Sequence, residues 1–196
     1  VTVDLNGFSI LGPSAVGTGR GLSGVGVSHT TVLNGTVQGM GNGGVSLAPH
    51  SRVEHVRAVS NGSFGSGTGL NSTISGNIAG RNGADGIDTQ ASAVSNNVTE
   101  GNKQDGINCI SQCSMNGNTA TLNGNCGISI GASSTVTSNT ANQNTSFGFC
   151  FTDAGGSATG YAHNVLNDNN GGNGNPQVSG GVEMGNNICG GAALCP

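Results

Sequence analysis

The sequence predicts an all-β solenoid, a single-stranded right-handed parallel β-helix of about eight or nine coils with about 20–21 residues in each. The first observation is a repeated phrase that begins at Gly86, Gly106, Gly127 and Gly148, so that its copies start at nearly equal intervals. The second is composition, because 38 of the 196 residues are Gly and only 7% are charged. A polar, Gly-rich chain could also be disordered. The fixed period argues against disorder, since apolar residues that return in register can stack on one another.

The chain begins with a strand pattern. Residues 3–10 read Val-Asp-Leu-Asn-Gly-Phe-Ser-Ile, and the pair Asn6-Gly7 reappears as Asn34-Gly35. We therefore expect every residue of the first repeat to pair with the second repeat at this one constant spacing. We expect residues 12–28, which are rich in Gly and Ser, to form a loop insertion that lengthens this first repeat. Because a strand is already under way at Val1, we also expect a leader or an N-terminal cap to precede it.

From Val32 the register becomes regular and forms three apolar columns. Alternation puts every second side chain of each short strand inside. Such strands, separated by Gly and Asn turns, predict three strands per coil, stacked about 4.8 Å apart. The columns are Val32, Val53, Ile74, Val94, Met115 and Val136; Val45, Ile87, Ile107, Ile128 and Phe149; and Leu47, Thr89, Cys109, Ile130 and Phe151.

Two columns of Asn mark the corners between strands. Asn tolerates the left-handed conformation that tight corners need, and stacked Asn amides can bond from coil to coil. The alternative is that these amides bind a ligand. The columns are Asn77, Asn97, Asn118, Asn139 and Asn164, and Asn61, Asn82, Asn102, Asn123 and Asn144.

After Phe151 the period loosens. An insertion at 152–160 comes first, and the pattern then resumes at Tyr161. We expect 167–196 to be an irregular segment, tied by a disulfide, in which 182–188 forms one last coil. Residues 1–196 are therefore expected to form one domain.

The six cysteines predict an exported protein in an oxidising environment. Cys109–Cys113 and Cys189–Cys195 are close enough in sequence to form two local disulfides. Cys126 and Cys150 fall one coil and about three residues apart, beyond the roughly 7 Å that a bridge allows between Cα atoms. Either the register differs at that corner, or these thiols are free, or they bond another chain.

Charge limits the possible partners. The net charge is −4 with only five Lys and Arg, so a nucleic-acid surface is not expected. No apolar run reaches the roughly 18 residues that a membrane helix needs. Together with the cysteines, this leads us to expect an extracellular protein with polysaccharide or further copies of the chain as partners.

The densest polar stretch, residues 50–57, offers candidate catalytic groups. In the register of the repeat His29 stacks on His50, and Arg52 and Glu54 share the outward face of one strand. A lyase that acts on a uronate must neutralise a carboxylate, remove a proton and protonate a leaving oxygen. Arg52 or Arg57, a His, and Glu54 could take these roles. The alternative, which we favour, is that Arg52 and Glu54 form a solvated ion pair and the His residues are turn residues.

A second group combines Asp85, Asp88, Asp105 and Asn108. Asp105 stacks on Asp85 and Asn108 on Asp88, and like charges one coil apart repel one another. Bound calcium, with oxygen ligands at about 2.4 Å, would offset this repulsion. Nearby Lys103 and Arg81 offer an alternative that needs no metal. Ca²⁺ is the only cofactor that the sequence suggests.

Phrases along the whole chain carry a family resemblance, namely Asp-Leu-Asn-Gly-Phe-Ser-Ile at 4–10, Gly-Tyr at 160–161 with Asn-Val-Leu at 164–166, and Val-Ser-Gly-Gly-Val at 178–182 with Gly-Asn-Asn-Ile-Cys at 185–189. The chain resembles exported bacterial right-handed parallel β-helix repeat proteins of the pectin-lyase-like superfamily. Relatives in that superfamily include polysaccharide lyases, hydrolases and epimerases, and many members are uncharacterised. The Asn-Thr-Asp, Asp-Asp, Gly-His-Gly and Arg-Ile-Lys signatures of its pectin-degrading hydrolases do not occur here.

Two functions of different class remain. The favoured one is an extracellular structural or adhesive solenoid that associates head to tail into filaments, because the bare backbone of an end coil can pair with another chain. The alternative is a carbohydrate-active enzyme or binding module, a polysaccharide lyase or glycoside hydrolase if it is an enzyme. The fold alone does not choose between them.

Overall fold

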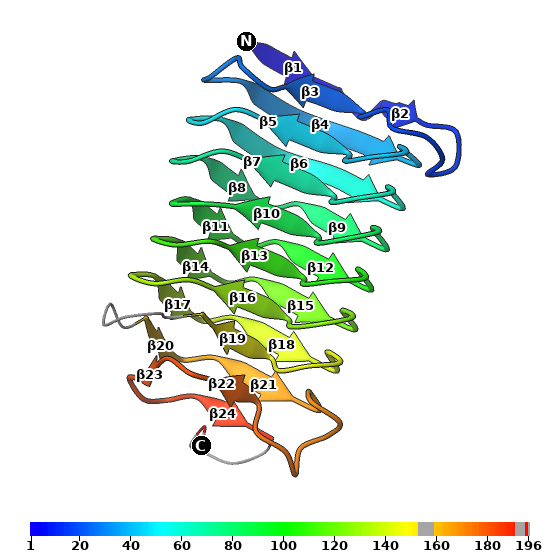
Figure 1. Cartoon of the computed structure of the whole chain (residues 1–196). Helices are drawn as coiled ribbons and strands as arrows, with labels where there is room; N and C mark the ends of the chain where they lie inside the picture. Colours follow the sequence, from blue (N-terminus) through cyan, green and yellow to red (C-terminus); the bar gives the residue numbers. More distant parts are fainter. Residues whose placement is uncertain (153–158, 191–194, 196) are drawn as a thin grey trace.

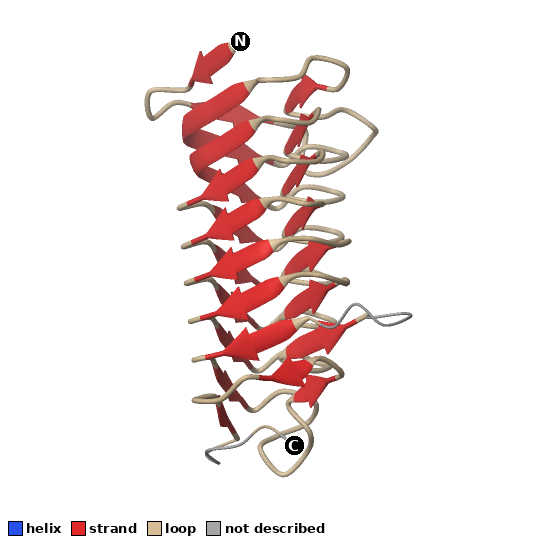
Figure 2. Cartoon of the chain, turned by 90° about the vertical axis from the view of Figure 1, so that its left-hand side faces the viewer, coloured by secondary structure: helices blue, strands red, loops and turns tan. Residues whose placement is uncertain are grey.

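The computed structural model describes residues 1–152, 159–190 and 195, which form a rod of stacked coils (Figure 1). Figure 2 shows the strands arranged in columns along the rod, with the two ends of the chain at opposite ends. In the described part of the chain all regular structure is β-strand, which confirms the predicted parallel β-helix of about eight coils. No helix that could span a membrane occurs among these residues.

Each regular coil contributes three strands, which we call its first, second and third positions. First and second positions build a 16-stranded sheet, and third positions build an 8-stranded sheet. The two long strands β4 and β6 run through the first and second positions of their coils. First positions are β1 (Thr2–Asp4), β4 (Thr31–Gln38), β6 (Arg52–Val59), β8 (Thr73–Ser75), β11 (Ala93–Ser95), β14 (Ser114–Asn116), β17 (Thr135–Thr137), β20 (Gly160–Ala162) and β23 (Val182–Glu183).

The remaining strands occupy the other two positions. Second positions, besides β4 and β6, are β2 (Ser9–Leu11), β9 (Ile78–Gly80), β12 (Val98–Glu100), β15 (Thr119–Thr121), β18 (Thr140–Asn142), β21 (Val165–Asn167) and β24 (Ile188–Cys189). Third positions are β3 (Leu22–Gly24), β5 (Val45–Leu47), β7 (Ser66–Thr68), β10 (Ile87–Thr89), β13 (Ile107–Cys109), β16 (Ile128–Ile130), β19 (Phe149–Phe151) and β22 (Val178–Ser179). The last coil, predicted at 182–188, is present as β23 and β24.

The three predicted apolar columns form the core of the rod. The column from Val32 to Val136 pairs in the predicted register, and its members are at most 1% exposed. Tyr161 continues that column one coil further. In the third-position column the hydroxyl of Ser66 is buried and, among the described residues, has no hydrogen-bond partner. Burial of the Val, Ile and Leu side chains of the three columns, at about 1.5–3 kcal/mol each, stabilises the stack.

Both predicted Asn columns are buried ladders. The Asn102 Oδ1 accepts the Asn82 N–H at 3.1 Å and its Nδ2 at 2.9 Å, and the Asn102 Nδ2 donates to the Ala79 carbonyl and to the Asn123 Oδ1, both at 3.0 Å. The same pattern recurs from coil to coil, and Gln177 takes the last place of this ladder by accepting from Asn169. These amides are satisfied within the protein, which supports their structural interpretation.

Two expectations about the first repeat are wrong. Its spacing to the second repeat is not constant, because Val3 pairs with Val32 whereas Ile10 pairs with Val37, which leaves the first coil longer between these two pairs. Residues 5–8 make a turn closed by the Phe8 N–H and the Leu5 carbonyl at 2.7 Å, and this turn takes up the extra length. Residues 12–28 are also not loop throughout, because β3 lies within them and pairs with β5. The predicted insertion at 152–160 lies mostly outside the described residues.

The cysteines form three disulfides. Cys109–Cys113 and Cys189–Cys195 are bonded as predicted. Cys126 and Cys150 are bonded as well, so the expectation that they lie too far apart is wrong. Cys150 does occupy the predicted register opposite Ser129. Cys126, however, lies in the corner before β16, where the chain turns, and its Cα is therefore only 6.1 Å from that of Cys150. Three disulfides are typical of proteins from oxidising, extracytoplasmic compartments.

Candidate functional site

Arg52 and Glu54 lie on the outer face of β6, on either side of the buried Val53. The Arg52 Nη2 donates to the Glu54 Oε1 at 2.6 Å. Their side chains are 57% and 21% exposed, so the pair is solvated, and such pairs contribute about 0–1 kcal/mol to stability. The two charges thus neutralise one another at the surface.

His29 and His50 stack at the corner that precedes the first strand position. Their ring centroids are 5.1 Å apart with an interplanar angle of 15°. Both residues have positive φ, +60° and +59°, as turn residues do. Their backbone N–H groups donate to the Pro49 and Leu70 carbonyls in the next coil. The stacking predicted from the register is therefore present, while a catalytic role for either ring remains a prediction.

Arg57 belongs to another surface. It lies past the corner at His55, whose φ is +52°, and it lines a hollow that neither the His pair nor Arg52 and Glu54 line. This hollow of about 210 Å³ lies over the second strand position, and a second hollow adjoins it through the shared residues Ser60 and Arg81. We call the two together the basic trough. Its lining residues are Gln38, Arg57, Val59, Ser60, Ile78, Gly80, Arg81 and Glu100, continued by Ala15, Asn61, Gly62, Gly83 and Lys103.

Glycines open the basic trough. In the column of β-strand ends that runs from Val59 through Gly80 to Glu100, Gly80 leaves a gap between two side chains. One coil beyond Arg81, Gly101 has a φ of +64°, and a Cβ there would lie 3.7 Å from the Arg81 Cγ. The aliphatic part of the Arg81 side chain therefore lies over a residue that has no side chain of its own.

Three of the five Lys and Arg residues of the chain line the basic trough, together with one carboxylate, that of Glu100. Within residues 1–152, 159–190 and 195, Arg52–Glu54 is the single ion pair. No hydrogen bond engages the guanidinium groups of Arg57 and Arg81 or the ammonium group of Lys103 in that part of the chain. Sequence reasoning missed this surface because it assigned Arg81 and Lys103 to the Asp carboxylates. The sequence does carry a signal for this surface, because Arg81 and Lys103 follow β9 and β12, two consecutive strands at the second position.

The Asp group lies on the outer face of the third strand position and the corner before it. The Asp85 Oδ1 accepts the Asp105 N–H at 2.9 Å, and the Asp105 Oδ1 accepts the Cys126 N–H at 2.9 Å and the Asn125 Nδ2 at 2.7 Å. Asn108 donates to the Asp88 Oδ1 at 3.1 Å. The predicted stacking of Asn108 on Asp88 is thus confirmed, and among the described residues backbone N–H groups and Asn side chains, not Lys or Arg side chains, donate to the carboxylates.

The pKa of Asp85 is raised from 3.8 to about 6, mainly by burial; the hydrogen bond from the Asp105 N–H opposes this shift, and the charges of Asp105 and Asp88 contribute to it. Burial also raises the pKa of Asp88 and of Asp105. No group of three or more His, Cys, Asp or Glu side chains in the described part of the chain is placed to hold a metal ion, so the calcium prediction gains no support.

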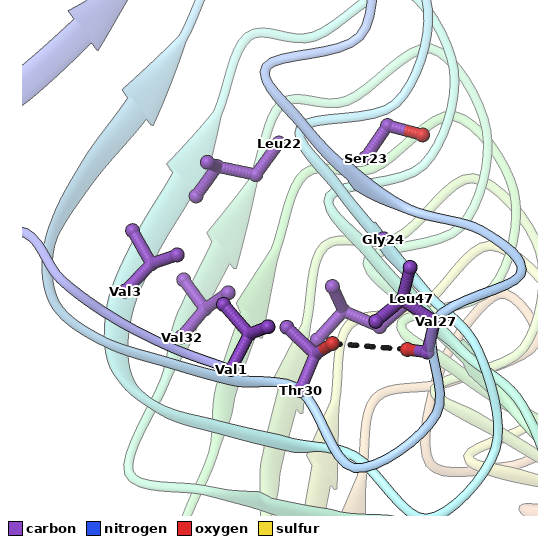
Figure 3. Close-up of a pocket in the computed structure, with 9 residues that line it drawn as sticks. All are labelled: Val1, Val3, Leu22, Ser23, Gly24, Val27, Thr30, Val32 and Leu47. Carbon is purple, nitrogen blue, oxygen red and sulfur yellow. Dashed lines mark hydrogen bonds between the residues drawn. The ribbon is translucent and has the colours of Figure 1, made fainter.

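The first coil carries an apolar hollow of about 160 Å³ (Figure 3). Val1, Val3, Leu22 and Val27 face it together with Val32 and Leu47 of the second coil. Thr30 also lines this hollow, and its hydroxyl donates to the Val27 carbonyl at 2.9 Å. Strands β1, β2 and β3 each pair with a strand on one side only, so this end of the rod combines apolar side chains with unpaired strand edges.

Comparison of the sequence with protein families and with curated proteins gives no match. Among solved structures, the chain is similar to the A-module of the mannuronan C-5 epimerase AlgE4 from Azotobacter vinelandii, with a TM-score of 0.61 and 17% sequence identity. The similarity covers 95% of this chain and 67% of that module. At this identity it shows a shared fold, a parallel β-helix, and confirms the fold that the resemblance implies.

Proposed function

We propose that this chain is an extracellular structural and adhesive solenoid, a stiff rod that holds polysaccharide on its side. The observation that carries the proposal is the continuous stacking of the coils. Two buried Asn ladders run from coil to coil, and each amide bonds its neighbours as well as the backbone. Such a rod keeps its shape and presents long, regular lateral faces.

The polar groups of the rung at residues 50–57 support the same proposal. Arg52 and Glu54 bind one another, and His29 and His50 stack as corner residues. These contacts occupy the charges of Arg52 and Glu54 and leave Arg57 as the cation of this stretch that is unpaired in the described part of the chain. The adhesive surface therefore lies where cationic side chains have no protein partner among these residues.

Binding without turnover is the test of this proposal. The purified protein is incubated with immobilised acidic and neutral polysaccharides, and retained protein is measured alongside reducing ends and the ultraviolet absorbance of unsaturated products. Retention on at least one polymer with no product formed supports the adhesive role. Catalytic turnover of any polymer, or no retention on all of them, contradicts it.

End-to-end association is the structural part of the proposal. The apolar first coil can accept a further coil, either from a second copy of the chain or from residues that precede Val1 in a longer protein. A second copy makes association depend on concentration, which analytical ultracentrifugation and electron microscopy measure. Val27 is 49% exposed at the hollow, so Val27→Lys should weaken association, whereas Leu122→Lys, at a 54% exposed lateral site, should not. Equal association of the two variants would contradict docking at the first coil.

A second candidate function is a carbohydrate-active enzyme that uses the Asp face. The specific observation in its favour is the pKa of Asp85, which burial raises to about 6, since a carboxyl group whose pKa is raised toward neutrality can act as a general acid. The fold is shared with a mannuronan epimerase, which adds only the architecture. Turnover in the assay above that Asp85→Asn abolishes would support this candidate and replace the adhesive proposal.

A further inference from the structure

We propose that the basic trough is a binding site for the anionic groups of an acidic polysaccharide, carboxylates or sulfates carried on sugars. The proposal rests on the adhesive role proposed above and names the surface and the ligand class. Arg57 and Arg81 supply two planar guanidinium groups, which suit the paired oxygens of carboxylates and similar oxyanions. Lys103 adds a third positive charge in the adjoining hollow.

The charge distribution of the chain makes this surface exceptional. The protein has a net charge of −4, yet three positive charges and only one carboxylate line the basic trough. A hollow lined by charges of one sign concentrates ligands of the opposite sign. Because the described residues offer no carboxylate within ion-pair distance of Arg57, Arg81 or Lys103, these cations remain available to a ligand.

The shape of the basic trough favours a polymer over a small anion. Its first hollow is lined by residues of four consecutive coils, from Gln38 on β4 through Arg57 and Ile78 to Glu100 on β12. Three steps between stacked strands span about 14 Å, more than one carboxylate or sulfate group occupies. The ligand therefore carries several groups along the rod.

The remaining lining suits a sugar. Gln38 and Ser60 offer an amide and a hydroxyl to hydroxyl groups, and Ile78, which is 45% exposed, offers an apolar contact to C–H groups. Three cations are too few for the two alternative ligands, a nucleic acid and a membrane surface. Proteins that grip nucleic-acid phosphates commonly make about 6–10 contacts, and polybasic membrane-binding segments carry about 4–8 Lys or Arg.

The test compares binding of polygalacturonate, dextran sulfate and neutral dextran by the whole chain and its variants. Arg57→Gln, Arg81→Gln and Lys103→Gln should each weaken binding of an acidic polymer by about two- to fivefold, and Arg57→Gln with Arg81→Gln by about tenfold. Arg20→Gln is the matched control, since it removes one positive charge from an exposed site outside the trough and should leave binding unchanged. Melting curves confirm that each variant is folded.

Two further variants test the shape and the sign of the charge. Glu100→Gln removes the single carboxylate of the trough and should tighten binding. Gly80→Val leaves the charges unchanged and fills the hollow; its Cβ would lie 3.2 Å from the Glu100 carbonyl oxygen, so the neighbouring backbone must shift by a few tenths of an ångström, and the melting curve shows whether the variant is folded. This variant should weaken binding as much as losing one Arg.

The outcomes separate this inference from the adhesive role. Preference for polygalacturonate assigns carboxylated sugars, and preference for dextran sulfate assigns sulfated ones; either supports the inference if the trough variants lose binding. If the double variant Arg57→Gln, Arg81→Gln binds an acidic polymer as strongly as Arg20→Gln does, the basic trough is not the binding site, although the adhesive role stands. Binding of neutral dextran alone would overturn the inference in the same way. Binding of none of the polymers would overturn both.

Discussion

Replacing Asp85 with Asn should stabilise the protein above about pH 6 and leave its stability nearly unchanged below about pH 4. Asp85 is half-buried beside Asp88 and Asp105, and its pKa rises from 3.8 to about 6. The folded state therefore favours the protonated carboxyl. The stabilising contribution of that group is complete below the unfolded pKa and is lost as the pH rises through the folded pKa. An Asn at this position is neutral throughout and still accepts the Asp105 N–H.

The size of the effect follows from the pKa. A shift from 3.8 to about 6 corresponds to at most about 3 kcal/mol at about 1.36 kcal/mol per unit. The carboxyl keeps contact with water on one side, and solvent screening reduces this figure to about 1 kcal/mol. For a chain of this length, about 1 kcal/mol raises the melting temperature by about 2–4 °C.

Melting curves of the wild type and Asp85→Asn between pH 4 and pH 8 measure this difference. The gap between the two melting temperatures should open through the window from about pH 4 to about pH 6 and then stay constant. Asp168→Asn, which removes one negative charge at an exposed position, is the matched control. A gap between Asp85→Asn and the wild type that does not change with pH would refute the account of the Asp face.

Two further predictions concern what holds the coils together. Asn102→Ala should destabilise the protein by about 3–5 kcal/mol, because the buried Asn82 N–H and side-chain amide each lose an acceptor. Chemical unfolding measures this loss of stability. A loss no larger than that of Asn116→Ala, at an exposed position, would contradict the role of the ladder. Replacing both Cys126 and Cys150 with Ser should cost about 3 kcal/mol, since this bridge closes a sequence separation of 24, whereas the Cys109–Cys113 pair, with a separation of 4, should cost about 2 kcal/mol. The reverse order of these two losses in the same unfolding experiment would show that loop closure does not dominate.

The stacking of the rod could be predicted from the sequence because each coil repeats the same physical problem. Apolar residues such as Ile87, Ile107 and Ile128 return at one register, and only their stacking buries them. The Asn columns followed from the same period. The first repeat was harder, since a turn at residues 5–8 shifts the pairing without changing the repeated phrase.

The surfaces could be predicted only in part. Register alone placed His29 on His50 and Asn108 beside Asp88, because both pairs are one coil apart on the same column. The Cys126–Cys150 bridge was missed because it depends on how sharply the chain turns at a corner. The basic trough was missed because it combines residues from two columns and depends on the missing side chain of Gly80.

The central claim is that this rod binds acidic polysaccharide and does not transform it. Calorimetric titration of the whole chain with soluble polygalacturonate or dextran sulfate tests both halves of the claim at once. The account predicts a transient heat of binding that saturates and that Arg57→Gln with Arg81→Gln weakens. A steady heat that continues after each injection, accompanied by new reducing or unsaturated ends, would contradict it.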